Sequence, residues 1–586
     1  MAVAVTPDRH QGGGLIGPTR TFALKRCSTA AVKLLLSSEF HSLASPRRMD
    51  KDKVTGMSNT PYLVSSPPSS VALPSFPGHP GPSKLIDDHF GGSLTRKRTN
   101  RGTRKEFAKG GPCVYIFARY SALTVDGCDV AQVTIDVLPD VALLDIFDFY
   151  MDEEHIDSWY TLVHVCRKWR NIVFGSPRRL KLRLYYKAKK PVRVMLDVWP
   201  ALPIIVKVHN REMWDIDHIV AALEHNDRIC RLDLIDIPSS QVDKVLPAMQ
   251  QPFPALTHLR LGYGDELTPV QPDSFLGGSA PRLQYLILNC IPFPELPKLL
   301  LSANHLVVLA LRNIPPSGYI SPVALVTGLS VLTCLEILNI TFKSPLSRLV
   351  QKTRRPPPQT RTLLPVLTAF LFIGACEYLE DLVAQIDAPL LDRFIMTLFQ
   401  QQTFDTPHLA RFIRRTPKFE AHDGAHVFFS DHDALISFSQ THARKLELRI
   451  SCRRPNLQLS SLAQICSSSF PLAFIPVVGS LHILQDEFSP LYWPDDIESS
   501  QWLALLRPFT AVKSLYISRR LVPGIAPALQ ELVGEGVTEA LPSLQTLFLE
   551  EPLPSEPVQE AIWRFVGARQ LAGHNIIMSC CKFEVR

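Results

Sequence analysis

The sequence predicts an α/β solenoid, in which a small helical domain precedes an irregular array of repeats that share one curved parallel sheet. A short apolar pattern recurs from Leu202 onward at intervals of roughly 23 to 29 residues, which is typical of stacked repeats. A stretch with helical periodicity lies just before the array, at 138–177. We therefore expect a disordered segment at 1–130, a helical domain at 131–178 and the repeat array at 179–586.

Residues 1–130 contain runs of Ser, Pro and Gly that bury too little apolar surface to offset the entropy of the chain. This segment also holds the basic excess behind the net charge of +7, whereas residues 131–586 are close to neutral. Its densest basic cluster, Arg96–Lys109, suits either a nuclear-import or nucleic-acid contact or a solvated disordered segment. Because the main body lacks a global positive field, we expect no specific nucleic-acid binding there.

The 12 cysteines are scattered and form no C-x-x-C pair, which argues against a zinc ribbon and against a dense disulfide framework. Scattered free thiols are typical of proteins in reducing compartments, so we expect a cytoplasmic or nuclear location. The N-terminus lacks the pattern of a signal peptide, and the longest apolar run, Leu363–Cys376, is too short to span a bilayer. We expect no membrane association and no cofactor.

The helical domain is expected to contain two or three short helices. It begins with features that favour a helix start, Pro139 followed by Asp140. Leu143 and Phe147 then lie one above the other on the first helix. A second helix is expected to carry an apolar stripe made of Leu162, Val165, Cys166, Trp169 and Val173, with the Cys166 thiol buried. About 40 residues are too few to bury this surface alone. This apolar surface is expected to be covered by the rest of the chain, by a partner, or by both. Cover by the rest of the chain would make the stretch an ordinary helical hairpin.

The order of these residues resembles the F-box, whose elements here are Leu138–Pro139, Ile146–Phe147 and Val165–Trp169. In that family the motif is a helical unit that binds the Skp-type linker subunit of a cullin–RING ubiquitin ligase. The following residues are similar to those that follow the motif in fungal F-box-like proteins. The sequence departs from the family at Val141–Ala142, where acidic residues are common. The resemblance implies docking through Leu138, Pro139, Leu143, Ile146, Phe147, Val165, Cys166 and Trp169.

The repeat pattern, L-x-x-L-x-L or an apolar variant, resembles leucine-rich repeats. Its copies begin at Ile229, Leu256, Leu283, Leu306, Leu335, Val512 and Leu544, and weaker ones at Leu367, Leu391, Leu446 and Leu481. One short strand cannot bury its apolar residues alone, but stacked parallel strands with returning helices share a continuous core. We expect returning helices near 214–229, 493–507 and 558–566, and a last strand at 576–578. A doubly wound α/β domain is the alternative.

The residues between the repeat leucines are expected to point away from the core, on the concave face where stacked repeats bind other molecules. This set mixes aromatic, aliphatic and polar groups, which suits a protein or peptide better than a phosphate backbone. An uninvolved solvent-facing sheet is the alternative for any one of them. The candidate contact residues are His258, Arg260, Tyr285, Ile337, Asn339, Tyr516 and Phe548, beside Ile287, Val308 and Ser514.

No catalytic motif is present: the sequence lacks a phosphate-binding P-loop, an H-E-x-x-H pair and a G-x-S-x-G turn. His422, His426 and Asp431 suggest the alternatives of a metal site or of a hydrolase or transferase site within 370–470, although turn and surface positions explain them more simply. We therefore expect a non-catalytic adaptor that docks a Skp-type linker and presents an unknown substrate protein. The rival is a binding scaffold unconnected to ubiquitin, with the F-box-like helices as the N-terminal cap of the array.

Overall fold

The chain divides into two units, residues 1–125 and residues 126–586. A computed structural model gives the fold of the second unit. The predicted disorder of 1–130, the basic cluster at 96–109 and the insertion at 354–358 lie outside the described residues. The structure describes residues 138–150, 158–176, 183–186, 193, 196, 201–208, 216–263, 274–344, 360–399, 404–419, 422–440, 443–468, 475–486, 498–534, 536, 538–551 and 555–581.

The helical unit consists of α3 (Asp140–Tyr150), α4 (Ser158–Val165) and α5 (Arg167–Gly175). Three helices agree with the two or three short helices that the sequence predicts, but the apolar stripe expected on one second helix is divided between α4 and α5, because the helix is interrupted at Cys166. This residue has extended backbone angles, and its Sγ accepts a hydrogen bond from the Trp169 backbone N–H at 3.4 Å. Cys166 is therefore the N-cap of α5 and is half-buried, not a buried residue on a continuous apolar stripe.

The unit is joined to the repeats by a short strand, β1 (Leu184–Tyr186), which pairs in parallel with β2 (Ile204–Val208). The Nε1 of Trp159 on α4 donates a hydrogen bond of 2.8 Å to the carbonyl of Arg183, just before β1. The first strand of the sheet thus begins within hydrogen-bonding distance of the helical unit.

The repeats form a 16-stranded sheet in the order β1-β2-β3-β4-β5-β6-β7-β9-β11-β14-β13-β12-β15-β16-β17-β18. Every adjacent pair is parallel except those that involve β13. The remaining strands are β3 (Ile229–Ile237), β4 (His258–Tyr263), β5 (Tyr285–Asn289), β6 (Val308–Ile314), β7 (Ile337–Phe342), β9 (Ala369–Gly374), β11 (Arg393–Phe399), β12 (Gly424–Phe429), β13 (Asp433–Gln440), β14 (Ala443–Ser451), β15 (Ser480–Gln485), β16 (Ser514–Ile517), β17 (Thr546–Glu550) and β18 (Ile577–Cys581), with β8 (Thr362–Leu363) and β10 (Ile386–Asp387) in a separate two-stranded sheet.

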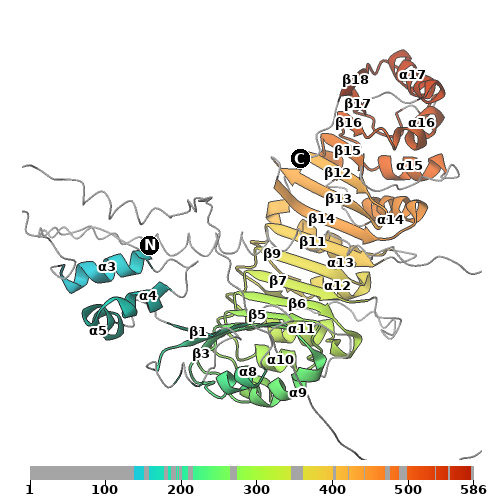
Figure 1. The fold of residues 1–586 in the computed structure, drawn as a ribbon. Helices are drawn as coiled ribbons and strands as arrows, with labels where there is room; N and C mark the ends of the chain where they lie inside the picture. Colours follow the sequence, from blue (N-terminus) through green and yellow to red (C-terminus); the bar gives the residue numbers. More distant parts are fainter. Residues whose placement is uncertain are drawn as a thin grey trace, which may run out of the picture. The chain divides into compact units, whose positions relative to one another are not determined.

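Helices lie along one face of this sheet (Figure 1). They are α8 (Ile216–Leu223), α9 (Ser239–Ala248), α10 (Leu296–Leu300), α11 (Pro322–Leu329), α12 (Cys376–Val383), α13 (Pro407–Arg414), α14 (Pro455–Ser468), α15 (Ser499–Leu506), α16 (Val522–Glu531) and α17 (Glu556–Leu571). A doubly wound domain has helices on both faces of its sheet, so the one-sided arrangement indicates a repeat solenoid. None of the described helices combines the length and apolar content needed to cross a bilayer.

The repeat leucines form the core, as the sequence predicts. In the copy that contains β4, Leu256, which precedes the strand, and Leu259 and Leu261 within it are each 1% exposed. All members of the other clear and weak copies are buried as well. Adjacent copies pair in register, for example Leu259 with Leu286. Each strand therefore adds one layer of apolar side chains to a core shared with the helices.

The middle of the array departs from simple stacking. The chain runs from β11 to β12, returns through the antiparallel β13, and pairs β14 with β11. The next repeat, β15, then pairs with β12. An inserted three-stranded meander thus lies between two runs of parallel repeats, and the sequence analysis did not predict it.

Candidate protein-binding surfaces

Side chains alternate along each strand, so the positions between the core leucines point away from the helices. In β4, Leu259 and Leu261 belong to the core, whereas His258 and Arg260 lie on the opposite side of the sheet. We call the surface formed by these alternate positions the far face. It contains every candidate contact residue that the repeat pattern predicts.

One row of far-face residues can be followed across the sheet, because neighbouring strands pair in matching register. In spatial order the row is Lys207, Asp233, Arg260, Ile287, Ala310, Asn339, Leu371, Ile395, Glu447, Ser437, His426, His482, Tyr516, Phe548 and Ser579. Its chemistry changes from charged through apolar to aromatic. Different parts of the far face therefore suit different contacts.

The C-terminal part of the row is a ladder of stacked rings, which we call the aromatic ladder: His426, His482, Tyr516 and Phe548. Successive ring centroids are 4.5, 4.1 and 4.2 Å apart, and the last two pairs are within 4° of parallel. Each ring comes from a different strand, β12, β15, β16 or β17, so strand pairing sets the spacing. All four side chains lie on the far face and are half-buried.

Most of the aromatic ladder is uncharged near pH 7. Burial, followed by the neighbouring His426, lowers the pKa of His482 to about 4, so this imidazole is neutral near pH 7. Burial, followed by the nearby Cys581, raises the pKa of Tyr516, which keeps its hydroxyl protonated. Three of the four rings, those of His482, Tyr516 and Phe548, are therefore uncharged near pH 7.

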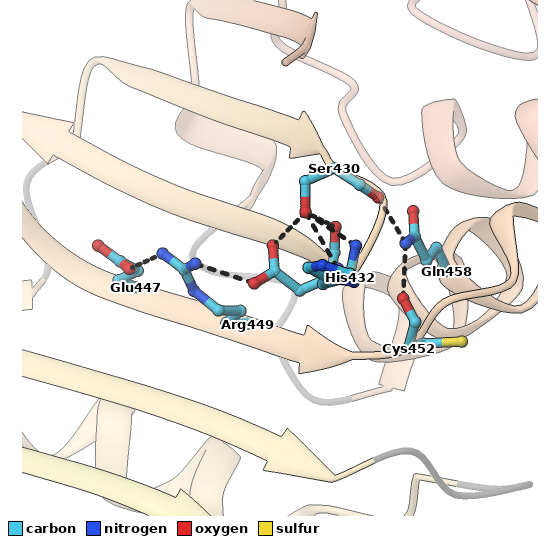
Figure 2. A network of polar contacts seen from close by, with 7 residues as sticks. Ser430, His432, Glu447, Arg449, Cys452 and Gln458 are labelled. Atoms are coloured by element: carbon cyan, nitrogen blue, oxygen red, sulfur yellow. Dashed lines mark hydrogen bonds and ion pairs between the residues drawn. The ribbon is translucent and has the colours of Figure 1, made fainter. Parts of the chain in front are cut away.

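Beside the ladder, the inserted meander carries a network of charged and polar groups (Figure 2). Arg449 on β14 donates to Asp433 at 2.9 Å and to Glu447 at 3.2 Å. Ser430 Oγ donates to the Asp433 carboxylate at 2.9 Å, and Gln458 Nε2 donates to the carbonyls of Ser430 and Cys452 at 2.8 and 2.7 Å. Because both carboxylates bind Arg449, this network links β13 to β14 and helps to hold the meander in place.

At the N-terminal end of the far face, His258 and Tyr285 stack with centroids 4.3 Å apart and planes 10° from parallel. Burial, then the positive charges of Arg231 and Arg183, lowers the pKa of His258 to about 4. Its Nδ1 lies 2.8 Å from the Thr257 hydroxyl. The imidazole is thus an uncharged group among arginines.

The centre of the far face is apolar and tightly packed. Ile337 retains 7% exposure, and Ile287 and Val308 are similarly buried, because adjacent strands bring these branched side chains against one another. Ile337 therefore offers little area to a partner. Asn339 is half-buried in the same region.

The suggested histidine site does not assemble. His422 is buried with its ring 5.8 Å from Phe438, a core side chain, whereas His426 lies on the far face in the aromatic ladder. Asp431 pairs with His432 in the turn before β13. Within the part of the chain that the structure describes, no three His, Cys, Asp or Glu side chains are grouped to hold a metal ion.

The helical unit divides the predicted docking residues into two groups. Leu143 and Phe147 are fully buried, and the Phe147 ring packs 4.7 Å from Trp169. Both residues therefore form the unit's own core and are not available to a partner, which corrects their assignment as contact residues. The helices are too short to be stable without such packing.

The second group reaches the surface. Ile146 on α3 and Val165 at the end of α4 are 45% and 55% exposed. Pro139 is also exposed, and Leu138, Cys166 and Trp169 are half-buried. Ile146, Val165 and Pro139 are therefore the predicted docking residues that are open to solvent.

Two rungs of the aromatic ladder, His426 and His482, were not among the predicted contact residues. His482 lies between Leu481 and Ile483, the same position that Tyr516 and Phe548 occupy in their repeats. The sequence therefore contained the signal for His482. His426 could not be found in this way, because it belongs to the meander and pairs with β15 only through the changed strand order.

No protein-family model matches the chain, and no curated protein sequence matches it. Among solved structures, the chain is similar to the leucine-rich repeat-containing protein LegL7 from Legionella pneumophila. The identity is 13%, the match covers 66% of this chain and 98% of that chain, and the TM-score is 0.24. We base the solenoid assignment on the strand order and the one-sided helices, not on this likeness.

Proposed function

We propose that this chain is a non-catalytic scaffold whose far face binds a partner polypeptide. The aromatic ladder is the observation that supports the proposal most strongly. Half-buried rings held in place by strand pairing give a partner a large contact area at little cost in side-chain entropy. Aromatic residues of this kind are enriched in protein interfaces.

Site-specific photo-cross-linking tests the scaffold. The full chain would carry benzoylphenylalanine at position 514, which lies beside Tyr516 on the far face of β16, or, as a control, at the exposed position 531 on α16. We expect polypeptide adducts from position 514 only. Excess wild-type chain should compete the adducts away, whereas excess Tyr516→Ala/Phe548→Ala chain should not. Equal yields from both positions, or equal competition by both chains, would contradict the proposal.

We further propose that the helical unit docks a Skp-type linker, which would make the chain a substrate adaptor of a cullin–RING ubiquitin ligase. The resemblance to the F-box and the exposure of Ile146 and Val165 support this role. Covering two such side chains stabilises a complex by roughly 1–2 kcal/mol each at 25 cal/mol per Å². The adaptor would act by proximity, holding a target near the ubiquitin donor.

The chain offers a matched control for this test. Val141 is on the same helix as Ile146 and is also exposed, at 59% against 45%, but acidic residues are common at its position in the F-box family. We expect Ile146→Asp with Val165→Asp to abolish co-purification with a recombinant linker, and Val141→Asp to preserve it. Circular dichroism checks that α3–α5 remain folded in both variants. Retention of the linker by the double variant would refute docking and leave the scaffold proposal intact.

A further inference from the structure

The last repeat of the array is not closed by a polar cap. β18 (Ile577–Cys581) is the final strand of the sheet, and no described strand pairs with its outer edge (Figure 1). Cys580 holds the register position of the core residue Leu549, yet it is exposed. Ile577 is 68% exposed, and Leu571 at the end of α17 is 93% exposed. Repeat arrays ordinarily end in a unit with a polar outer surface, which this end lacks.

The backbone of β18 has hydrogen-bonding groups to offer at this edge. The Ile577 N–H and the Cys581 carbonyl form hydrogen bonds of 2.8 and 3.1 Å on the β17 side. Successive residues of a strand direct their backbone groups to opposite sides, because the chain is extended. Met578 and Cys580 therefore direct both their N–H and their C=O groups toward the open edge.

The side chains of β18 do not protect the edge. Native sheets commonly protect an edge strand with a charged residue, a proline or a bulge. Residues 577–581 read IMSCC and pair with β17 without a register shift, so β18 has none of these. An uncharged strand of this kind can pair with another strand, and it carries no charge that would repel an identical one.

Two copies of β18 match each other when they run antiparallel about Ser579. Met578 of each copy then lies opposite Cys580 of the second copy, and the two residues exchange both backbone hydrogen bonds. All of the outward N–H and C=O groups of these residues are used. Ser579 lies opposite itself and Ile577 opposite Cys581, so no like charges meet.

The other edge of the described sheet, β1, is a poorer match for β18. β1 has three residues, and its Leu184 N–H donates to the Pro203 carbonyl on the β2 side. By the same alternation, only Tyr185 within this strand directs its backbone groups outward. Pairing of β1 with β18 would therefore make about half as many hydrogen bonds, and it would build an open filament. Antiparallel pairing of two β18 strands closes at two copies.

We propose that the chain forms a twofold dimer in which β18 pairs antiparallel with β18 of a second copy, with Ser579 at the axis. Such an axis is perpendicular to the sheet, so the two sheets join and both far faces lie on the same side. Phe548 on β17 lies three strand spacings, or about 14 Å, from Phe548 of the second copy. The dimer does not depend on the scaffold function, but it places two aromatic ladders together as a bivalent surface.

Size-exclusion chromatography with light scattering of the full chain tests the dimer. We expect a mass twice the 65.6 kDa of one chain. Met578→Pro removes an outward N–H but no hydrogen bond to β17, so it should weaken the dimer about tenfold or more. Met578→Leu keeps the N–H and should remain dimeric. Circular dichroism checks that both variants are folded.

A second variant does not depend on how well β18 accepts proline. Ser579→Lys places two like charges opposite each other at the axis and should also weaken the dimer about tenfold or more. Thr327→Lys, at an exposed position on α11, adds the same charge elsewhere and should not.

Disulfide formation tests the register in a Cys580→Ser/Cys581→Ser background. Ser579→Cys should give a disulfide-linked dimer on mild oxidation, because residues opposite each other in a non-hydrogen-bonded pair have Cα atoms about 4.5 Å apart. Ile577→Cys faces position 581 of the second copy, so it should not cross-link, and neither should the background chain.

Four results would overturn the inference: a monomeric wild-type chain at micromolar concentrations, assemblies larger than a dimer, a dimer that neither Met578→Pro nor Ser579→Lys weakens, or a disulfide from position 577 in place of 579. Photo-cross-linking from position 514 that persists in a monomeric chain would remove the dimer and leave the scaffold proposal intact.

Discussion

The rings of His482 and Tyr516 lie 4.1 Å apart and 2° from parallel on the neighbouring strands β15 and β16. Strand pairing places the two residues directly opposite each other, so the stack is a product of register. The same position in the next repeat holds Phe548, which extends the stack on the other side of Tyr516. Tyr516 is therefore the residue on which the aromatic ladder depends.

We predict that Tyr516→Ala lowers the free energy of unfolding by about 1–2 kcal/mol, because it removes two cross-strand ring contacts. Tyr516→Phe keeps both stacks and should stay within about 0.5 kcal/mol of the wild type. Urea denaturation followed by circular dichroism measures both values. The alanine variant should also raise the pKa of His482 from about 4 toward 6.5, since a neighbour that buries the imidazole is lost. A histidine pKa that does not move would show that Tyr516 does not shield His482.

The pH dependence of stability gives a second prediction. His482 and His258 both have a pKa of about 4 in the folded chain, compared with the ordinary histidine value of 6.5 that applies to the unfolded chain. Between these values the unfolded chain binds more protons, so their contribution to stability is present above pH 6.5 and is lost as the pH falls toward 4. We expect the melting temperature to decrease as the pH is lowered from 6.5 to 4. His258→Phe with His482→Phe should flatten the decrease, and an unchanged slope in the double variant would contradict the assignment.

The sequence predicted the layers of the solenoid better than their order. Leucines such as Leu259, Leu286 and Leu309 were placed correctly because the period of the repeat and the alternation of strands depend on local spacing. The β12–β14 meander depends on long-range pairing, which local spacing does not determine. The interruption between α4 and α5 depends on the extended backbone angles of Cys166, which make this residue the N-cap of α5. Apolar spacing alone does not predict these angles.

The candidate surfaces were predictable to the same extent. Tyr516 and Phe548 follow from position within the repeat, whereas His426 depends on the meander. Burial of Ile337 and Phe147 depends on neighbours that are distant in sequence, Val308 for one and Trp169 for the other. Periodicity therefore identifies the face of the sheet on which a residue lies, but not how much of its side chain reaches solvent.

Glu380 on α12 gives a third prediction, of opposite sign to that for the histidines. Its buried carboxyl accepts hydrogen bonds from the backbone N–H groups of His408 and Leu409, at 2.9 and 2.7 Å, and so caps α13. Burial, the largest effect, raises its pKa from 4.5 to about 7. The folded chain binds more protons between these values, so the stability from this group is present below pH 4.5 and is lost as the pH rises through 7.

Replacing this carboxyl tests the effect. Glu380→Gln keeps an acceptor for α13 but cannot ionise, so its melting temperature relative to that of the wild type should rise between pH 4.5 and 7. Glu380→Ala removes both acceptors and should cost about 1–3 kcal/mol at every pH, through unsatisfied N–H groups. Scanning calorimetry at several pH values distinguishes the two. Parallel curves for the Gln variant and the wild type would show that Glu380 does not titrate in this range.

Arg569 on α17 gives the last prediction, because it is a fully buried cation with incomplete hydrogen bonding. Its Nη2 donates to the carbonyl of Leu541, while its Nε and Nη1 have no hydrogen-bond partner within the described residues. The guanidinium carbon lies 5.5 Å from the centroid of the Phe565 ring.

Replacing a buried charge of this kind with an apolar side chain of similar length is often neutral or stabilising. We therefore expect Arg569→Met to unfold within about 1 kcal/mol of the wild type, whereas Arg569→Ala should lose roughly 2–4 kcal/mol because it leaves a cavity under α17. Urea denaturation compares the two variants, and an equal loss in both would show that the guanidinium itself stabilises the last repeat.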